Sequence, residues 1–216
     1  MKKMFLLAGF LSMIFVSYAQ SKFRLNGFAA YTFQDNFDGY YDANNFFTGK
    51  VNGSFQWGAS AEYFPGSQIS IELLYQRSDT KAPTSFKNGA ANPLQTENFN
   101  VGLNYIMAGC NGYMYTGNDK FEPYGGIMAG VVLANIEAPS KNASNSTSNF
   151  AWGAKLGTNI WLSDRMGLKL QAQMLSSSRV TGGDVYFSWW GPVYLDTYST
   201  LWQFSLGGGL AFKLGH

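Results

Sequence analysis

The side chains able to carry acid–base chemistry are scarce in this chain. His216 is its single histidine and also its last residue. Hydrolytic mechanisms that use a Ser or Asp side chain need a neighbouring base or water activator, most often a histidine. A histidine at the end of the chain, beyond every regular stretch, is poorly placed for that role. The sequence therefore predicts no catalytic residue, no cofactor and no enzymatic activity.

Six charged residues share a different property: each occupies the polar face of a stretch whose alternate positions are mostly apolar. These residues are Arg24, Glu62, Glu72, Lys155, Lys169 and Lys213. If that face lines a narrow barrel, the charges must be paired, because an unpaired buried charge is costly. We therefore expect ion pairs that plug the interior. The alternative is a narrow conduit in which the same pairs act as a gate.

A third group of candidate residues is aromatic. The stretch 176–199 contains Tyr186, Phe187, Trp189, Trp190 and Tyr194. Exposed aromatic side chains often mark binding surfaces, so this stretch is a candidate contact surface for a receptor, a polysaccharide or a neighbouring protein. The same side chains also suit an aromatic belt at the edge of a membrane. Both interpretations fit the sequence.

Oxygen-bearing side chains are frequent in the stretch 34–50, which includes Asp35, Asp38 and Asp42. Oxygen ligands at such spacing are typical of Ca²⁺ loops, but the full signature and its closing glutamate are missing. Asp and Asn in such a stretch commonly form turns. We therefore expect no metal site. Cys110 is the sole cysteine, so no intramolecular disulfide can form.

The elements that would position these residues are clearest in the stretch 150–174. Apolar residues alternate there with small or polar residues on both sides of the short polar segment Ser163-Asp164-Arg165. Strict alternation on either side of a tight turn predicts a β-hairpin whose two faces meet different environments.

The same alternation recurs along the chain and predicts eight strands. They are expected at 23–33, 54–63, 69–76, 98–107, 121–136, 150–162, 166–174 and 202–214. Long connections at 34–50, 78–95, 137–149 and 176–199 alternate with shorter ones at 65–67, 108–120 and 163–165. Strands of about 9–11 residues cross a bilayer when tilted, and alternating short turns and long loops are typical of outer-membrane barrels.

The polarity of the two faces indicates the class of sheet. One face is apolar and aromatic, while the other carries mainly small, amide and a few charged residues, as in a barrel with lipid outside and a polar lumen inside. We therefore predict an all-β fold, a single closed antiparallel eight-stranded transmembrane up-and-down barrel. A lipocalin-like soluble barrel is the alternative. It would turn Lys155 and Lys169 toward water, and it would normally carry more charge on its outer face.

The first residues are typical of a secretory signal. Lys2 and Lys3 precede an apolar run from Met4 to Val16, and small residues at Ser17 and Ala19 place the expected cleavage before Gln20. We therefore expect a signal peptide at 1–19 and one barrel domain at 20–216. Loss of the two lysines lowers the formal charge from +2 to about zero, which argues against a nucleic-acid partner.

With a signal, eight strands and the ending Gly209-Leu210-Ala211-Phe212-Lys213-Leu214, the chain resembles the small outer-membrane barrels of the OmpA-, OmpX- and OmpW-like kind. In those families the last strand is read by the barrel-assembly machinery, and Gly209, Phe212 and Leu214 match the spacing of that assembly signal. Two departures are present. Leu214-Gly215-His216 replaces the usual terminal aromatic residue. Gly207 stands at the first position of the assembly signal, which is polar in those families.

The resemblance implies a protein in contact with outer-membrane lipid in a Gram-negative-type bacterium, with both termini periplasmic. We expect a non-enzymatic barrel with a structural or surface-interaction role, its external loops contacting an unknown extracellular or envelope partner. The alternative function is a narrow pore or carrier for small or hydrophobic solutes.

Overall fold

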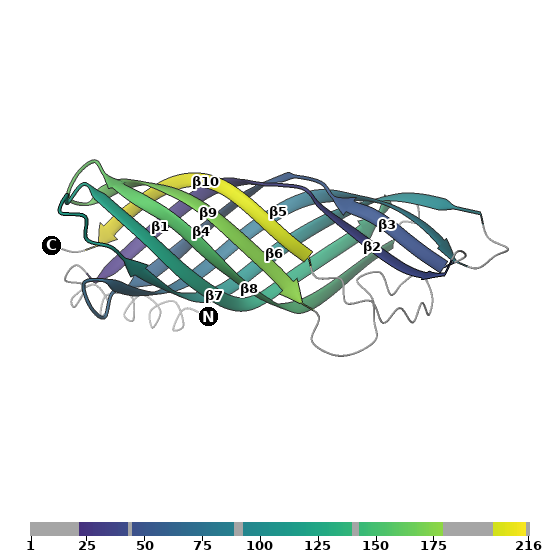
Figure 1. The fold of residues 1–216 in the computed structure, drawn as a ribbon, viewed down its shortest axis with the longest axis horizontal. Helices are drawn as coiled ribbons and strands as arrows, with labels where there is room; N and C mark the ends of the chain where they lie inside the picture. Colours follow the sequence, from purple (N-terminus) through teal and green to yellow (C-terminus); the bar gives the residue numbers. More distant parts are fainter. Residues whose placement is uncertain (1–21, 43–44, 89–92, 140–142, 179–200, 215–216) are drawn as a thin grey trace, which may run out of the picture.

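The computed structural model describes residues 22–42, 45–88, 93–139, 143–178 and 201–214. Within them the chain is almost entirely β-structure (Figure 1). The strands are β1 (Phe23–Thr32), β2 (Asp35–Asp42), β3 (Asn45–Val51), β4 (Ser54–Tyr63), β5 (Ile69–Asn88), β6 (Gln95–Tyr113), β7 (Phe121–Ala138), β8 (Ala143–Trp161), β9 (Met166–Ser178) and β10 (Leu201–Leu214). None of the described segments forms a helix with the length and apolar character needed to cross a membrane.

Eight of these strands close into a barrel, in the order β5-β4-β1-β10-β9-β8-β7-β6 and back to β5. Every pairing is antiparallel, and β1 meets β10 in a continuous register from Phe23 opposite Leu214 to Thr32 opposite Ser205. Closure satisfies the backbone hydrogen bonds of both terminal strands, which lipid would otherwise leave unmade. The predicted closed eight-stranded antiparallel barrel is confirmed.

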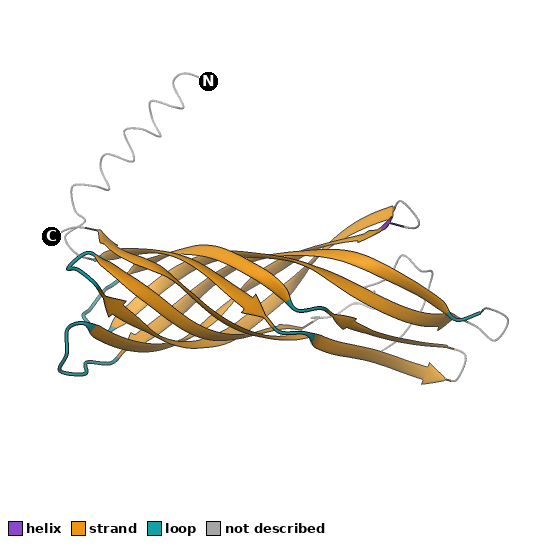
Figure 2. Cartoon of the chain, turned by 90° about the horizontal axis from the view of Figure 1, so that it is seen from above, coloured by secondary structure: helices purple, strands orange, loops and turns teal. Residues whose placement is uncertain are grey.

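The two ends of the barrel differ. The segments 64–68, 114–120 and 162–165 connect strands at one end, where Phe23 and Leu214 also lie; we call it the short-turn end. At the opposite, long-strand end, the hairpins β5–β6 and β7–β8 extend well beyond the closed barrel (Figure 2). These four strands contain 18 to 20 residues each, about twice the length needed to span a bilayer.

Several predicted loops are wrong because they form strands. Stretch 34–50 is a β2–β3 hairpin that pairs with the far part of β5, from Gly49 opposite Thr84 to Asn45 opposite Asn88. Much of 78–95 and 137–149 belongs to β5, β6 and β8, and the 108–120 connection shrinks because β6 continues to Tyr113. These segments are rich in Asp, Asn, Ser and Gly, which favour turns, but pairing with a neighbouring strand edge overrides that local preference.

The outer wall is apolar around the closed barrel. Leu73 and Ile127 expose 63% and 71% of their surface, whereas Glu72, next to Leu73 in β5, is buried. A wall with so much exposed apolar surface fits lipid rather than water. Lys155 and Lys169 both lie inside, which excludes the lipocalin-like alternative.

Strand β6 departs from the predicted orientation. The expectation that the apolar face meets lipid predicts its apolar series on the outer wall, yet these side chains point inward and are buried: Phe99, Val101, Leu103, Tyr105 and Met107. The alternating Asn98, Asn100 and Asn104 face outward instead. At Phe99 and Val101 the cause is their position toward the long-strand end, where the interior is apolar and the exterior projects beyond the apolar wall. Tyr105 and Met107 lie within the closed barrel, opposite Gln76 and Leu74, and the outward Ile106 between them belongs to the apolar wall, so both faces of β6 are partly apolar there.

Inward-facing glycines make room for large side chains in the narrow barrel. A Cβ added at Gly157 would lie 2.6 Å from Tyr124 Oη and would also collide with the Leu170 carbonyl oxygen. At Gly58, an added Cβ would lie 2.6 Å from Phe28 Cζ. The abundance of glycine is thus partly explained by tight packing inside the barrel.

This packing predicts that Gly157→Ala destabilises the barrel by about 1–3 kcal/mol, the usual cost of overpacking. Gly27→Ala is the matched control, because a Cβ on this outward-facing glycine meets nothing within 4 Å. Urea unfolding of both proteins refolded into phosphatidylcholine vesicles measures the difference. Equal unfolding midpoints for Gly157→Ala and Gly27→Ala would show that the lumen can accommodate a methyl group at residue 157 without overpacking.

Candidate functional site

The charged residues of the barrel interior meet near the short-turn end. Lys169 Nζ on β9 lies 3.1 Å from Glu62 Oε1 on β4, and these side chains are 1% and 0% exposed. Lys155 on β8 pairs with Glu72 on β5 and is equally buried. Both pairs join residues from different parts of the barrel wall, so each crosses the lumen rather than following one strand.

Glu62 is the most highly connected of these groups. Besides Lys169, it accepts hydrogen bonds from Asn26 Nδ2 at 2.6 Å, from Ser70 Oγ at 2.8 Å and from the Tyr113 hydroxyl. These donors come from β1, β5, β6 and β9. A buried carboxylate needs several donors to replace its lost hydration, and Glu62 obtains them by joining five strands.

Asn111 links the two ion pairs. Its Nδ2 donates to Glu72 Oε2 at 3.0 Å and lies 3.1 Å from Ser70 Oγ, which in turn donates to Glu62. The pairs are therefore parts of one hydrogen-bonded network. We call these two pairs, together with the ion pair of Arg24 and Glu122 described next, the lumen charge network.

Arg24 forms the third ion pair, at the short-turn mouth of the lumen. Its Nη1 lies 3.0 Å from Glu122 Oε2, and its Nη2 donates to Oε1 at 3.2 Å. Its guanidinium carbon lies between 4.5 and 4.9 Å from the ring centres of Phe64, Tyr113 and Trp161. A delocalised guanidinium suits such aromatic surroundings.

Sequence reasoning missed Glu122 as a partner of Arg24. It lies at the start of β7, whose glycines at 125, 126 and 130 obscured which face was which. Its alternation with Tyr124 and Met128, both buried inside, was the signal that could have identified it. With Glu122 included, three buried cations face three carboxylates, so the lumen charge network is electrically balanced.

Lys213, the sixth predicted residue, does not join an ion pair within 4 Å among the residues described. Its Nζ instead lies 3.8 Å from the centre of the Trp161 ring. Five of the six predicted charges thus enter ion pairs, while Lys213 remains at the mouth as a cation–π partner.

A layer of amides and tyrosines lies in the lumen beyond the charges. Tyr105 Oη donates to Gln203 Oε1 at 2.7 Å, and Gln173 Nε2 donates to Gln76 Oε1 at 3.2 Å. Further along, the lumen is lined by buried apolar side chains that include Leu103, Val132 and Ile136. The interior is therefore mainly ionic near the short-turn end, mixes amide side chains with apolar ones such as Leu74 and Met107 in its middle, and is mainly apolar toward the long-strand end.

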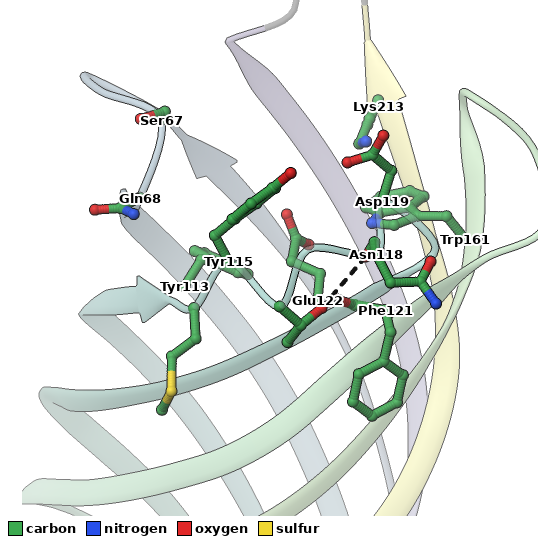
Figure 3. Close-up of a pocket in the computed structure, with 12 residues that line it drawn as sticks. Ser67, Gln68, Tyr113, Tyr115, Asn118, Asp119, Phe121, Glu122, Trp161 and Lys213 are labelled. Carbon is green, nitrogen blue, oxygen red and sulfur yellow. Dashed lines mark hydrogen bonds between the residues drawn. The ribbon is translucent and has the colours of Figure 1, made fainter.

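A pocket of about 480 Å³ opens at the short-turn mouth (Figure 3). It is lined by Ser67, Gln68, Tyr113, Met114, Tyr115, Thr116, Asn118, Asp119, Phe121, Glu122, Trp161 and Lys213. The Thr116 hydroxyl holds the rim by donating to the Phe121 carbonyl oxygen at 2.8 Å. The pocket is a vestibule whose inner wall includes Glu122, the partner of Arg24.

The remaining candidate residues have different places. Phe212 and Leu214 face the outer wall near the short-turn end, and Gly209 faces inward, where a Cβ would collide with Phe28. The five aromatic contact candidates, Tyr186, Phe187, Trp189, Trp190 and Tyr194, lie outside the described residues, as does the predicted signal peptide.

The sequence matches no protein-family model and no curated protein. Solved structures do match. Neisserial surface protein A (NspA) aligns with 13% identity and a TM-score of 0.57, covering 88% of this chain and 96% of NspA. The outer membrane protein OprG from Pseudomonas aeruginosa aligns with 15% identity and a TM-score of 0.56, covering 90% of this chain and 97% of OprG. The chain has the fold of the small eight-stranded outer-membrane barrels.

The geometry of the lumen charge network predicts that Glu72→Gln destabilises the barrel by about 3–5 kcal/mol, because it leaves Lys155 buried without its counter-charge. Adding Lys155→Met should restore most of the lost stability, since it removes the stranded ammonium group. Both effects are measured by urea unfolding in phosphatidylcholine vesicles.

The matched control for Glu72→Gln is Asp79→Asn, which breaks the exposed Arg77–Asp79 pair on the outside of β5. Exposed pairs contribute less than about 1 kcal/mol, so this variant should unfold almost like the unmodified protein. Similar losses in Glu72→Gln and Asp79→Asn would contradict a specific contribution from the lumen pair.

Proposed function

We propose that this protein is a non-enzymatic outer-membrane barrel of a Gram-negative-type bacterium, with a closed lumen and a structural or surface-interaction role. The observation that carries the proposal is the lumen charge network. Two ion pairs with side chains no more than 2% exposed cross the barrel, and their partners bind one another through Ser70 and Asn111. A conduit for water or ions would require these groups to be hydrated or displaced, at considerable free-energy cost.

The surface role rests on the shape of the long-strand end. β5 to β8, together with the β2–β3 hairpin, extend well beyond the closed barrel (Figure 1). Short turns of such barrels are periplasmic and the longer connections are external, so the projecting strands reach outward from the cell. Tyr186, Phe187, Trp189, Trp190 and Tyr194 lie on the connection from β9 to β10 and are the proposed contact residues for an extracellular or envelope partner.

Export and assembly belong to the same proposal. The segment 1–19 serves as a signal peptide, and the outward Phe212 and Leu214 with Gly209 serve as the assembly signal on β10. Their position on the strand that closes the barrel against β1 suits recognition before closure.

A second candidate function is a carrier for hydrophobic molecules, for which the apolar part of the lumen is the chemically suited region. Phe99, Leu103, Val132 and Ile136 already fill that region, with at most 4% of their surface exposed, so a molecule entering from the long-strand end would have to displace them. Such a carrier would hold its cargo above the lumen charge network, because ionic side chains fill the barrel below.

Location and orientation are tested by cysteine labelling in intact cells. In a Cys110→Ser background, Ser144→Cys at the long-strand end, where residue 144 is exposed, should react with a membrane-impermeant maleimide. Thr116→Cys at the short-turn end should react only after the outer membrane is permeabilised. Labelling of Thr116→Cys in intact cells, with Ser144→Cys protected, would contradict the proposed orientation. Protection of both would contradict surface exposure.

A further inference from the structure

The outward face of the long-strand end carries a concentration of positive charge. Arg77 and Lys81 alternate on the outside of β5, and Lys50 of β3 is exposed beside them. The neighbouring strands are tied here, since the Asn52 backbone N–H donates to the Lys81 carbonyl oxygen at 2.9 Å. We call Lys50, Arg77 and Lys81 the outward cationic cluster.

The cluster lies immediately beyond the apolar wall. Trp57 is opposite Arg77 in the β4–β5 register, and its ring meets that of Tyr75 edge-on with centres 6.0 Å apart. Exposed Trp and Tyr side chains at such a boundary are typical of the membrane interface. The cations that follow them along β5 are therefore at the depth where lipid phosphates lie.

The charge is unbalanced and confined to one sector. Asp79 is the acid placed between these cations, and it forms an ion pair with Arg77 at 2.8 Å. Three positive charges against Asp79 give the cluster a net charge of +2, and the exposed Glu137, opposite Asn100 on β7, lowers the charge of the wider face to +1. Apart from Lys87 further along β5, the other Lys and Arg residues in the described part of the chain lie in the lumen or at the short-turn end.

The adjacent face of β6 supplies neutral hydrogen-bonding groups. Asn104 is opposite Arg77, Asn100 is opposite Lys81, and Asn98 lies one step further along the same outward face. Asn104 already accepts a hydrogen bond from Tyr75 Oη at 3.0 Å, leaving its amide donors free for another acceptor. Cations beside amides are suited to a ligand that presents both phosphate and hydroxyl groups.

We propose that the outward cationic cluster and the Asn98–Asn100–Asn104 row bind a phosphorylated glycolipid of the outer leaflet. Its acyl chains lie along the apolar wall below Trp57 and Tyr75. Its phosphates meet Lys50, Lys81 and Arg77, and its sugar hydroxyls meet the asparagine amides. This inference rests on the proposed outer-membrane location, and it assigns a specific lipid contact to one side of the barrel.

The test uses the full chain refolded into phosphatidylcholine nanodiscs, with binding of bisphosphorylated lipid A measured by native mass spectrometry. Lys50→Gln/Lys81→Gln should weaken binding on the order of ten- to thirtyfold, as expected for two lysines near an anionic surface. The matched control, Lys22→Gln/Lys120→Gln, removes the same charge at the short-turn end and should bind like the unmodified protein. Equal binding by all three proteins, or equal losses in both variants, would overturn the proposal.

Two further probes separate the parts of the ligand. Dephosphorylated lipid A should bind weakly, and phosphatidylglycerol, which has a phosphate without the phosphorylated sugars, should bind less tightly than lipid A. Equal binding of either probe would overturn a phosphorylated-glycolipid site. Because nanodiscs do not depend on the orientation in cells, lipid A binding can fail while the cysteine labelling succeeds, or the reverse, so the two proposals are tested separately.

Discussion

A charge inside a narrow barrel must be paired, and the rest of this structure depends on how that requirement is met. Glu62 and Glu72 face Lys169 and Lys155 across the lumen, and Arg24 faces Glu122 at its mouth. Since the hydrogen bonds to Glu62 come from four other strands, correct pairing of the charges requires correct closure of the barrel. The network therefore specifies the register of the wall as well as filling its interior.

The interior is arranged by depth. Ionic groups lie nearest the short-turn end, amides and tyrosines follow, and apolar side chains fill the part nearest the long-strand end. The exterior changes in the opposite sense, from apolar around the closed barrel to polar and charged beyond Trp57 and Tyr75. This reversal lets one continuous strand such as β5 form first part of the closed barrel with its apolar outer wall and then part of a projecting sheet with an apolar interior.

The sequence was most informative where the alternation was strict. The hairpin of β8 and β9, with Lys155 and Lys169 inside and Leu170 outside, follows the predicted faces. β6 alternates as strictly, but the expectation that apolar residues face lipid places its apolar side chains on the wrong side. Periodicity shows that a strand has two different faces without showing which of them points into the barrel. Only the neighbouring strands determine that Phe99 points inward.

The other differences have similar causes. The β2–β3 hairpin is composed of turn-forming residues and exists because β5 provides an edge for it, which no local pattern reveals. Glu122 was hidden by the glycines of β7, whose missing side chains remove the alternation. The network itself could be anticipated as a set of charges on one face, but its particular pairs depend on strand register across the lumen.

The most direct measurement of the central claim, that paired charges close the lumen, is single-channel conductance of the refolded protein in a planar bilayer. Insertion is verified independently by protection of the barrel from protease. The closed-lumen account predicts an inserted protein with no discrete current steps. Steady, unitary openings from the inserted protein would contradict it and would identify the lumen charge network as the gate of a pore.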